Sequence, residues 1–252
     1  MVGNQNGIKL KTVIVNHNCN KNAILLKKKF SLFSEALLID SGSDIEESEI
    51  VYFDFRLDNV YYNGLLNKTY EILSDDYTHL LFITSDVTVH DCEGLISRIH
   101  EVYQKDIGVY APSAKHSTHS QMNNHETLGL RKVTFTEGFC FVTPKTFLNQ
   151  ICPIDLSLNK IGHGVDIYFG YLSMVNKKFA VVDDKIIVNH PHGSGYNDKE
   201  ARVQRDNWFR TKSKQARLFH YLASLDFLKN AFGFYLILFL MNFVSVKKVE
   251  NL

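Results

Sequence analysis

The chain has 252 residues, 45% hydrophobic and 22% charged, which suits one large globular domain with a buried core. Its formal net charge is +1, so the composition excludes a global positive field that would attract nucleic acid. The four cysteines, Cys19, Cys92, Cys140 and Cys152, form no C-x-x-C pair, and the N-terminus has no apolar signal segment, so we expect a protein of the reducing cytoplasm.

The first half of the chain alternates strand and helix patterns. Strands are expected at 11–18, 36–40, 50–55, 78–84 and 107–112, and helices at 21–33, 60–76 and 92–104. Strands that alternate with helices pair in parallel through right-handed crossovers, and ligands bind beyond the carboxyl ends of such strands. We therefore expect an α/β fold with a mostly parallel central sheet flanked by helices.

The second half is less regular. A polar stretch with three histidines, 113–130, is expected to be a loop, and 132–151 to form a strand, a turn, a strand and a short helix. Glycines precede an amphipathic helix over 162–178, and 179–198 is expected to contain two short strands and a Gly-rich loop.

Acidic residues follow two of the buried strands. Asp86 ends "LLFITSD" and is either a turn or helix-cap carboxylate or a ligand of Mg²⁺ or Mn²⁺, which prefer oxygen. Asp40, Ser43 and Asp44 lie in the turn "IDSGSD", which is either an Asx-type turn or a site where Gly42 lets a ligand approach the backbone.

Two later segments also carry candidate chemistry. Asp166 in "GHGVDI" is either a helix-start acid that interacts with the helix dipole or a general base for a hydroxyl. His190 and His192 in "VNHPHGSGY" are either surface histidines or ligands that complete a metal site with a carboxylate.

The order of these segments resembles the GT-A nucleotide-sugar glycosyltransferases, most closely the bacterial family 2-like enzymes. The matching segments are "TVIVNHN", "IDSGSD", "NVYYNGLLN", "ITSD", "TEGFCFV", "GHGVDI" and "VDDKIIVNHPHGSGY". They span roughly residues 11 to 200, so the resemblance implies a GT-A catalytic domain over 1–200 and a C-terminal helical extension over 201–252.

The resemblance implies a site for a nucleoside-diphosphate sugar donor. The donor-binding residues it implies are Asn16, Asp40, Ser41, Asn63, Ser85 and Asp86. Asp86 matches the last acid of the family's D-x-D metal motif, whereas Thr84 replaces the first acid. The implied cofactor is Mn²⁺ or Mg²⁺, held by Asp86 and by His192 as the matching late histidine, with His190 second.

The resemblance also implies an acceptor side and a reaction. Asp166 is the implied catalytic base, Glu137 faces the acceptor, and His163 stands where a Trp is often found. The reaction is a single displacement with inversion at the anomeric carbon, onto a hydroxyl of a glycan or a lipid-linked glycan in cell-surface polysaccharide synthesis. The Gly-rich residues 192–197 are then a lid that excludes water.

Two other functions fit the same pattern. A catalytically inactive binding or scaffold module on this fold is favoured by Thr84 at the metal motif. A nucleotidyltransferase is disfavoured, because "VNHNCNKN" lacks the glycines of a phosphate loop.

The tail raises the question of a membrane. Residues 231–246 are strongly apolar but fall short of the ~20 residues that a spanning helix needs. The two main interpretations are a core helix and an interfacial anchor or partner-docking helix, and a spanning helix is the third. Seven Lys/Arg against two Asp/Glu give 199–217 a net charge of +5, which suits anionic lipid on the inner face of the cell membrane. Arg202 and Arg205 alternatively reach the donor diphosphate.

Overall fold

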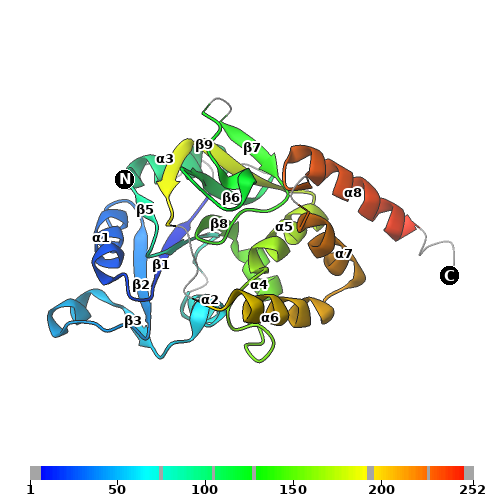
Figure 1. Cartoon of the computed structure of the whole chain (residues 1–252). Coiled ribbons are helices and arrows are strands. Elements are labelled where there is room, and N and C mark those ends of the chain that lie inside the picture. Colours follow the sequence, from blue (N-terminus) through cyan, green and yellow to red (C-terminus); the bar gives the residue numbers. More distant parts are fainter. Residues whose placement is uncertain are drawn as a thin grey trace.

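A computed structural model of the chain describes residues 7–73, 76–103, 106–126, 129–191, 196–225 and 228–246. These residues contain one nine-stranded sheet with the order β3-β2-β1-β4-β8-β6-β9-β5, and β7 pairs with β9 (Figure 1). The strands are β1 (Leu10–Asn16), β2 (Glu35–Ser41), β3 (Phe55–Leu57), β4 (His79–Thr84), β5 (Thr88–Val89), β6 (Ile107–Ala114), β7 (Leu130–Val133), β8 (Cys140–Pro144) and β9 (Phe179–Asn189).

The pairing of these strands fixes their directions. β1, β2, β3, β4, β6 and β9 run one way, because β1–β2, β1–β4, β2–β3 and β6–β9 pair in parallel and β8 pairs antiparallel with both β4 and β6. β5, β7 and β8 run the other way. The expected α/β fold with a mostly parallel central sheet is therefore confirmed.

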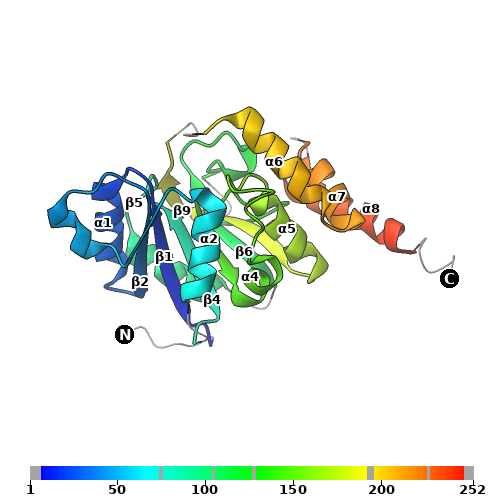
Figure 2. The ribbon, with the colours of Figure 1, turned by 90° about the horizontal axis from the view of Figure 1, so that it is seen from below.

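Helices cover both faces of the sheet. α2, α4 and α5 pack on one face, α1 and α3 lie against the other, and α6, α7 and α8 extend beyond α5 (Figures 1 and 2). Their bounds are α1 (Asn20–Phe30), α2 (Tyr61–Ile72), α3 (Cys92–Val102), α4 (Lys145–Ile151), α5 (Val165–Val175), α6 (Asp198–Arg210), α7 (Lys214–Ala223) and α8 (Ala231–Val246).

The centre of the sheet explains the apolar runs in the sequence. β1 lies between β2 and β4, and Val13, Ile14 and Val15 are at most 3% exposed because both faces are covered. Asn16 is in register with Asp40, and Val15 with Thr84. The polar residues at the ends of β1, β2 and β4 are thus brought to one edge of the sheet.

Two expected strands are wrong. Residues 50–52 of the expected strand 50–55 lie in a 3₁₀ helix, η1 (Glu47–Tyr52), and only Phe55 belongs to β3. The expected pair of strands in 179–198 is one long strand, β9, with a three-residue irregularity, since Asp183 pairs with Pro112 but Ile187 with Ser113. The polar residues 183–185 are accommodated within the strand.

The C-terminal helices share the core of the sheet. Trp208 of α6 is 1% exposed and its ring lies edge-on to Tyr168 of α5, and Phe219 of α7 and Ile237 of α8 belong to the same buried cluster as the strands. In the described part of the chain, no helix combines the length and the apolar character needed to cross a membrane.

Candidate functional site

The edge formed by β1, β2 and β4 contains a buried network centred on Asn16. Asn16 Nδ2 donates to Asp40 Oδ1 over 2.8 Å and to Ser43 Oγ over 3.0 Å, and Asn16 Oδ1 accepts from Ser85 Oγ over 2.8 Å. Asn16 is fully buried and Asp40 is 1% exposed. The network therefore links the end of β2 to the residue that precedes Asp86.

The turn after β2 has the Asx geometry. Asp40 Oδ2 accepts from the Ser43 backbone N–H over 3.0 Å, and Gly42 has a φ of +69°. A Cβ on Gly42 would lie 2.8 Å from the Asn59 backbone nitrogen, so the turn requires glycine. Ser41 Oγ accepts from the Val60 N–H over 3.0 Å and so joins this turn to the start of α2. Donor contacts of Asp40 and Ser41 remain predictions.

Asp86 lies at the rim of this edge with two polar partners. The Thr84 hydroxyl donates to Asp86 Oδ1 over 2.5 Å, and His190 Nε2 lies 3.3 Å from Asp86 Oδ2. Burial raises the pKa of Asp86, but the hydrogen bonds from His190 and Thr84 outweigh burial and lower it below its ordinary value. Asp86 is therefore an ionised carboxylate near neutral pH.

His190 is fixed in turn by an aromatic ring. Its imidazole stacks on Phe139 with ring centres 4.5 Å apart and an interplanar angle of 16°. Burial lowers the pKa of His190, whereas the hydrogen bond and charge of Asp86 raise it, and the net result is a raised pKa. His192, the histidine that the resemblance favours, and the three residues after it lie outside the described residues.

An open pocket of about 450 Å³ lies beside this pair. It is lined by Asp86, Thr88, Lys115, His116, Asn189, His190 and Pro191. Lys115 and His116 are exposed and follow β6 directly, so the pocket combines a carboxylate, imidazoles and an ammonium group. Such a wall suits an anionic ligand that is bound together with a cation.

Asp166 stands at the head of α5 within electrostatic reach of the same rim. Gly164, the N-cap residue, has a φ of +87°, and Asp166 Oδ1 accepts from the Ile167 backbone N–H over 2.8 Å. Burial raises the pKa of Asp166 to about 6, the charge of His119 opposes this shift, and the charge of Glu137 adds to it. The carboxylate is therefore tuned close to neutral pH.

Glu137 connects the two halves of the site. Its charge raises the pKa of both Asp166 and His190, and His190 in turn contacts Asp86. Glu137 Oε2 also accepts from Ser117 Oγ over 2.8 Å. The charge of Glu137 therefore acts both on Asp166 and on His190, the partner of Asp86.

Asn63 lies under the segment that carries Asp166. It is fully buried, and its Nδ2 donates to the Asn159 carbonyl over 2.6 Å. Asn159 Nδ2 donates to the His163 carbonyl over 3.1 Å, and Asn159 Oδ1 accepts from the Gly162 N–H over 3.0 Å. The structure therefore gives Asn63 a role in holding the loop before α5, while its predicted donor contact is untested.

His163 is partly buried in the same loop. Burial, and then the charge of Arg205, lower its pKa, so the ring is neutral near pH 7. Among the described residues, its Nδ1 is buried without a hydrogen-bond partner. An acceptor contact by this ring remains a prediction.

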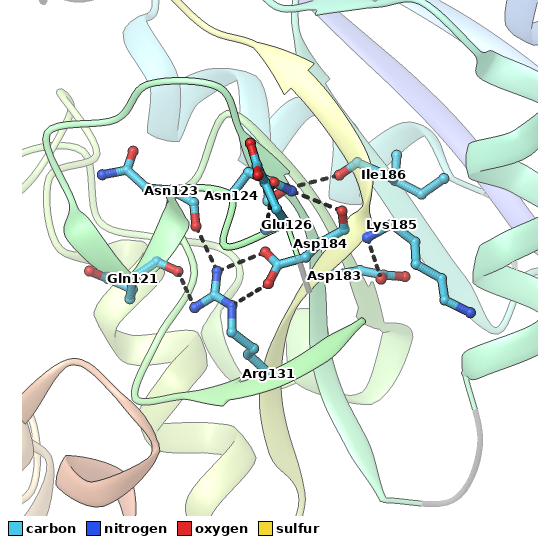
Figure 3. A network of polar contacts seen from close by, with 10 residues as sticks. Gln121, Asn123, Asn124, Glu126, Arg131, Asp183, Asp184, Lys185 and Ile186 are labelled. Atoms are coloured by element: carbon cyan, nitrogen blue, oxygen red, sulfur yellow. Dashed lines mark hydrogen bonds and ion pairs between the residues drawn. The ribbon is translucent and has the colours of Figure 1, made fainter. Parts of the chain in front are cut away.

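An ion-pair network holds the loop that follows β6 (Figure 3). Arg131 of β7 binds Asp184 through two hydrogen bonds of 2.7 and 3.0 Å, and it also donates to the carbonyls of Gln121 and Asn123 over 3.1 and 2.8 Å. Asn124 Nδ2 reaches the Asp184 carbonyl over 2.8 Å. The irregularity in β9 thereby positions the segment that supplies Lys115, Ser117 and His119.

The donor set is compatible with a divalent cation that is bound mainly by a substrate. Among the described residues no three His, Cys, Asp or Glu side chains form a metal-binding group. Asp86 Oδ2 and His190 Nε2 are 3.3 Å apart, close to the ~3 Å between adjacent ligands of an octahedral ion with 2.1 Å bonds. Mg²⁺ commonly takes one or two protein carboxylates plus phosphate oxygens, so this pair fits such an ion.

Sequence reasoning missed several residues of the site. Lys115, His116 and His119 belong to the polar stretch interpreted only as a loop, and its three histidines were the available signal. Tyr62 was also missed; its hydroxyl donates to the Gly138 carbonyl over 2.9 Å, and burial and the charge of Asp166 raise its pKa well above the ordinary value.

Comparison with known proteins addresses the fold. No protein-family model matches the chain, and no curated protein does. Solved structures do match. GalNAc-T7 with UDP, GalNAc and Mn²⁺ has a TM-score of 0.59 at 11% identity, over 86% of this chain and 51% of that one. The chain has the GT-A fold.

Two further GT-A structures extend this similarity. The mannosyltransferase PcManGT from Pyrobaculum calidifontis, in complex with GDP-Man and Mn²⁺, has a TM-score of 0.57 at 10% identity, over 93% of this chain and 69% of that one. Glucosyl-3-phosphoglycerate synthase from Mycobacterium tuberculosis, with Mn²⁺, UDP and glucosyl-3-phosphoglycerate, has a TM-score of 0.51 at 11% identity. The match covers 85% of this chain and 80% of that one. The chain spans about half the length of GalNAc-T7.

Proposed function

We propose that this protein is a glycosyltransferase that moves a sugar from a nucleoside-diphosphate sugar to an acceptor hydroxyl, with inversion at the anomeric carbon. The observation that supports the proposal is the contact between Asp86 and His190 in a chain with the GT-A fold. The charge of Glu137 acts on both His190 and Asp166, which supports a common site. One end of this set suits a diphosphate bound with a cation, and the other end suits a proton acceptor.

The donor side of the proposal rests on Asp86 and the pocket beside it. Asp86 and His190 would hold Mn²⁺ or Mg²⁺, with His192 as a further ligand from outside the described residues. Such an ion neutralises charge on the departing diphosphate. Lys115 supplies a further positive charge in the pocket wall, and the buried Asn16 network holds the strand ends in place.

The acceptor side of the proposal rests on Asp166. A carboxylate with a pKa of about 6 is ionised at neutral pH and still basic enough to take the proton of a hydroxyl as the hydroxyl attacks the anomeric carbon. The new bond forms between the acceptor oxygen and the anomeric carbon, the bond to the diphosphate oxygen breaks, and the proton ends on Asp166. Glu137 and His163 would line the acceptor position, and we propose a glycan or lipid-linked glycan as the acceptor.

The test is a screen of nucleoside diphosphates by thermal shift, with and without Mn²⁺, followed by turnover of the matching sugar donors. A ligand that binds only the folded state raises the melting temperature, so the correct base should stand out. Asp86→Ala should abolish both Mn²⁺-dependent binding and turnover. Asp166→Asn should keep donor binding and lose transfer by ~10²-fold or more.

Asp106→Asn is the matched control and should bind and turn over the donor normally. Asp106 is exposed at the start of β6, whereas the pocket residues Lys115 and His116 follow its end. Donor binding without turnover by the wild-type protein would favour the inactive binding module. Thr84 at the first position of the predicted metal motif also favours that alternative. Retention of the anomeric configuration, read by NMR of the product, would contradict the single displacement.

A further inference from the structure

Helix α8 leaves a stripe of large apolar side chains in solvent. Phe232, Tyr235, Phe239 and Leu240 are 67%, 49%, 57% and 37% exposed. Their spacing of three, four and one residues puts them on one side of the helix, whereas Phe234, Ile237 and Met241 on the other side are buried. Three of the four exposed side chains are aromatic.

The segment that contains α7 and α8 carries a net positive charge. Between residues 207 and 246 the sequence has five Lys/Arg and one acid, Asp226, which gives +4, whereas the whole chain carries only +1. Lys214, Arg217 and Tyr221 are exposed on α7 at a spacing of three and four residues, and so share one side of that helix. Lys132 Nζ donates to the Tyr235 hydroxyl over 2.9 Å at the edge of the stripe.

We propose that this surface, formed by the stripe on α8 together with Lys214, Arg217 and Tyr221 of α7, docks on a membrane that contains anionic lipid. Aromatic side chains with a polar tip favour the headgroup region, and Lys and Arg beside them attract anionic headgroups. At 1.5 Å per residue the 16 residues of α8 span roughly 24 Å, shorter than the hydrocarbon core, so the helix lies in the interface plane.

The distribution of charge distinguishes this occupant from a second copy of the chain. An isologous contact pairs this surface with itself, and neither α7 nor α8 has an acid that could pair with Lys214 and Arg217 of the other copy. A lipid surface supplies the opposite charge together with an apolar layer.

The docking surface is also tied to the acceptor side of the site. The connection between α7 and α8 is held by Thr134, whose N–H donates to the Lys229 carbonyl over 3.0 Å, and Lys229 Nζ lies 3.5 Å from His119 Nδ1. Thr134 is three residues before Glu137. This last step alone rests on the proposed function. The bound membrane would then bring a lipid-linked acceptor toward the side of the site that contains Glu137.

The experiment is co-sedimentation of the full chain with vesicles of phosphatidylcholine alone and with 30 mol% phosphatidylglycerol, at about 50 and 500 mM salt. We expect binding to the anionic vesicles that weakens at high salt, because surface charges are screened. Phe232→Ser combined with Phe239→Ser should reduce the bound fraction at least tenfold, and Lys214→Glu combined with Arg217→Glu should reduce it similarly at low salt.

The matched control is Leu32→Ser, which removes a side chain that is 75% exposed two residues after the end of α1. Figure 1 shows α1 and α8 at opposite ends of the molecule. It should bind as the wild type does, and so should Asp166→Asn, because docking does not depend on catalysis. Thermal unfolding of each variant shows that it is folded. The proposal is overturned if the wild type ignores anionic vesicles, if the double serine variant binds normally, or if light scattering shows a dimer that the serine substitutions dissociate.

Discussion

The Thr84 hydroxyl donates a hydrogen bond of 2.5 Å to Asp86 Oδ1, so the residue at the first position of the predicted metal motif supports the acid at the last. A hydrogen bond to a charged group contributes about 1.5–3 kcal/mol. Thr84→Val removes the hydroxyl at nearly constant volume, and we expect Mn²⁺-dependent nucleotide binding to weaken by about tenfold. Isothermal titration with the preferred nucleoside diphosphate measures this change, and Thr84→Ser, which keeps the hydroxyl, is the control that should bind normally.

The raised pKa of Asp166 predicts the pH dependence of transfer. A general base must be ionised, so kcat should fall as the pH decreases through about 6, the pKa that burial gives this carboxyl. A pH–rate profile between pH 5 and 8, at saturating donor, measures it. A profile that is flat across pH 6 would remove Asp166 from the base role.

The same carboxyl makes a prediction about stability. Its pKa is raised from the ordinary value of 3.8, so its stabilising contribution is complete below pH ~4 and is lost as the pH rises through about 6. Asp166→Asn does not titrate, and we expect it to be more stable than the wild type by about 3 kcal/mol at pH 8. The difference should shrink toward pH 4, as followed by urea unfolding at both pH values; an equal difference at both would contradict the assignment.

The sequence predicted the parts of the fold that depend on local patterns. The apolar runs that became β1, β2 and β4 end in Asn16, Ser41 and Thr84, and parallel pairing is sufficient to bring these ends together. The prediction of a strand over 50–55 was wrong, because part of this segment forms the 3₁₀ helix η1. Whether β-branched and aromatic residues form a strand depends on a neighbouring strand to pair with, which the local sequence does not reveal.

Tertiary ion pairs explain the other differences. β9 looked like two strands because Asp183 and Asp184 are charged, but Arg98 and Arg131 neutralise them at 2.7 Å each, and both acids are buried within the strand. The contact between His190 and Asp86 joins residues 104 apart, and His119 reaches the site from a loop. Such partners are set by packing, which spacing along the chain does not encode.

The burial of Asn63 predicts an effect on turnover without an effect on donor affinity. Asn63→Ala removes the hydrogen bond to the Asn159 carbonyl and loosens the loop that leads to Asp166. We expect kcat to fall about tenfold with an unchanged donor Kd, and stability to fall by about 1–3 kcal/mol. Asn67→Ala, one turn further along α2, breaks two hydrogen bonds to Ile154 and should cost similar stability with little change in kcat. A raised donor Kd in Asn63→Ala would instead support the donor contact predicted from the sequence.

Removing one partner of the Arg131–Asp184 ion pair should lower the free energy of unfolding strongly. The two side chains are 14% and 1% exposed, so Arg131→Met leaves a buried carboxylate without its cation. We expect a loss of about 3–5 kcal/mol in the free energy of unfolding, measured in urea. The double variant Arg131→Met with Asp184→Leu removes the unpaired charge as well and should recover part of that loss.

The same double variant should keep its fold but lose activity. Arg131 also binds the carbonyls of Gln121 and Asn123, so without it the loop no longer positions His119 and Lys115. Full activity in that variant would show that the loop does not depend on the hydrogen bonds from Arg131 of β7.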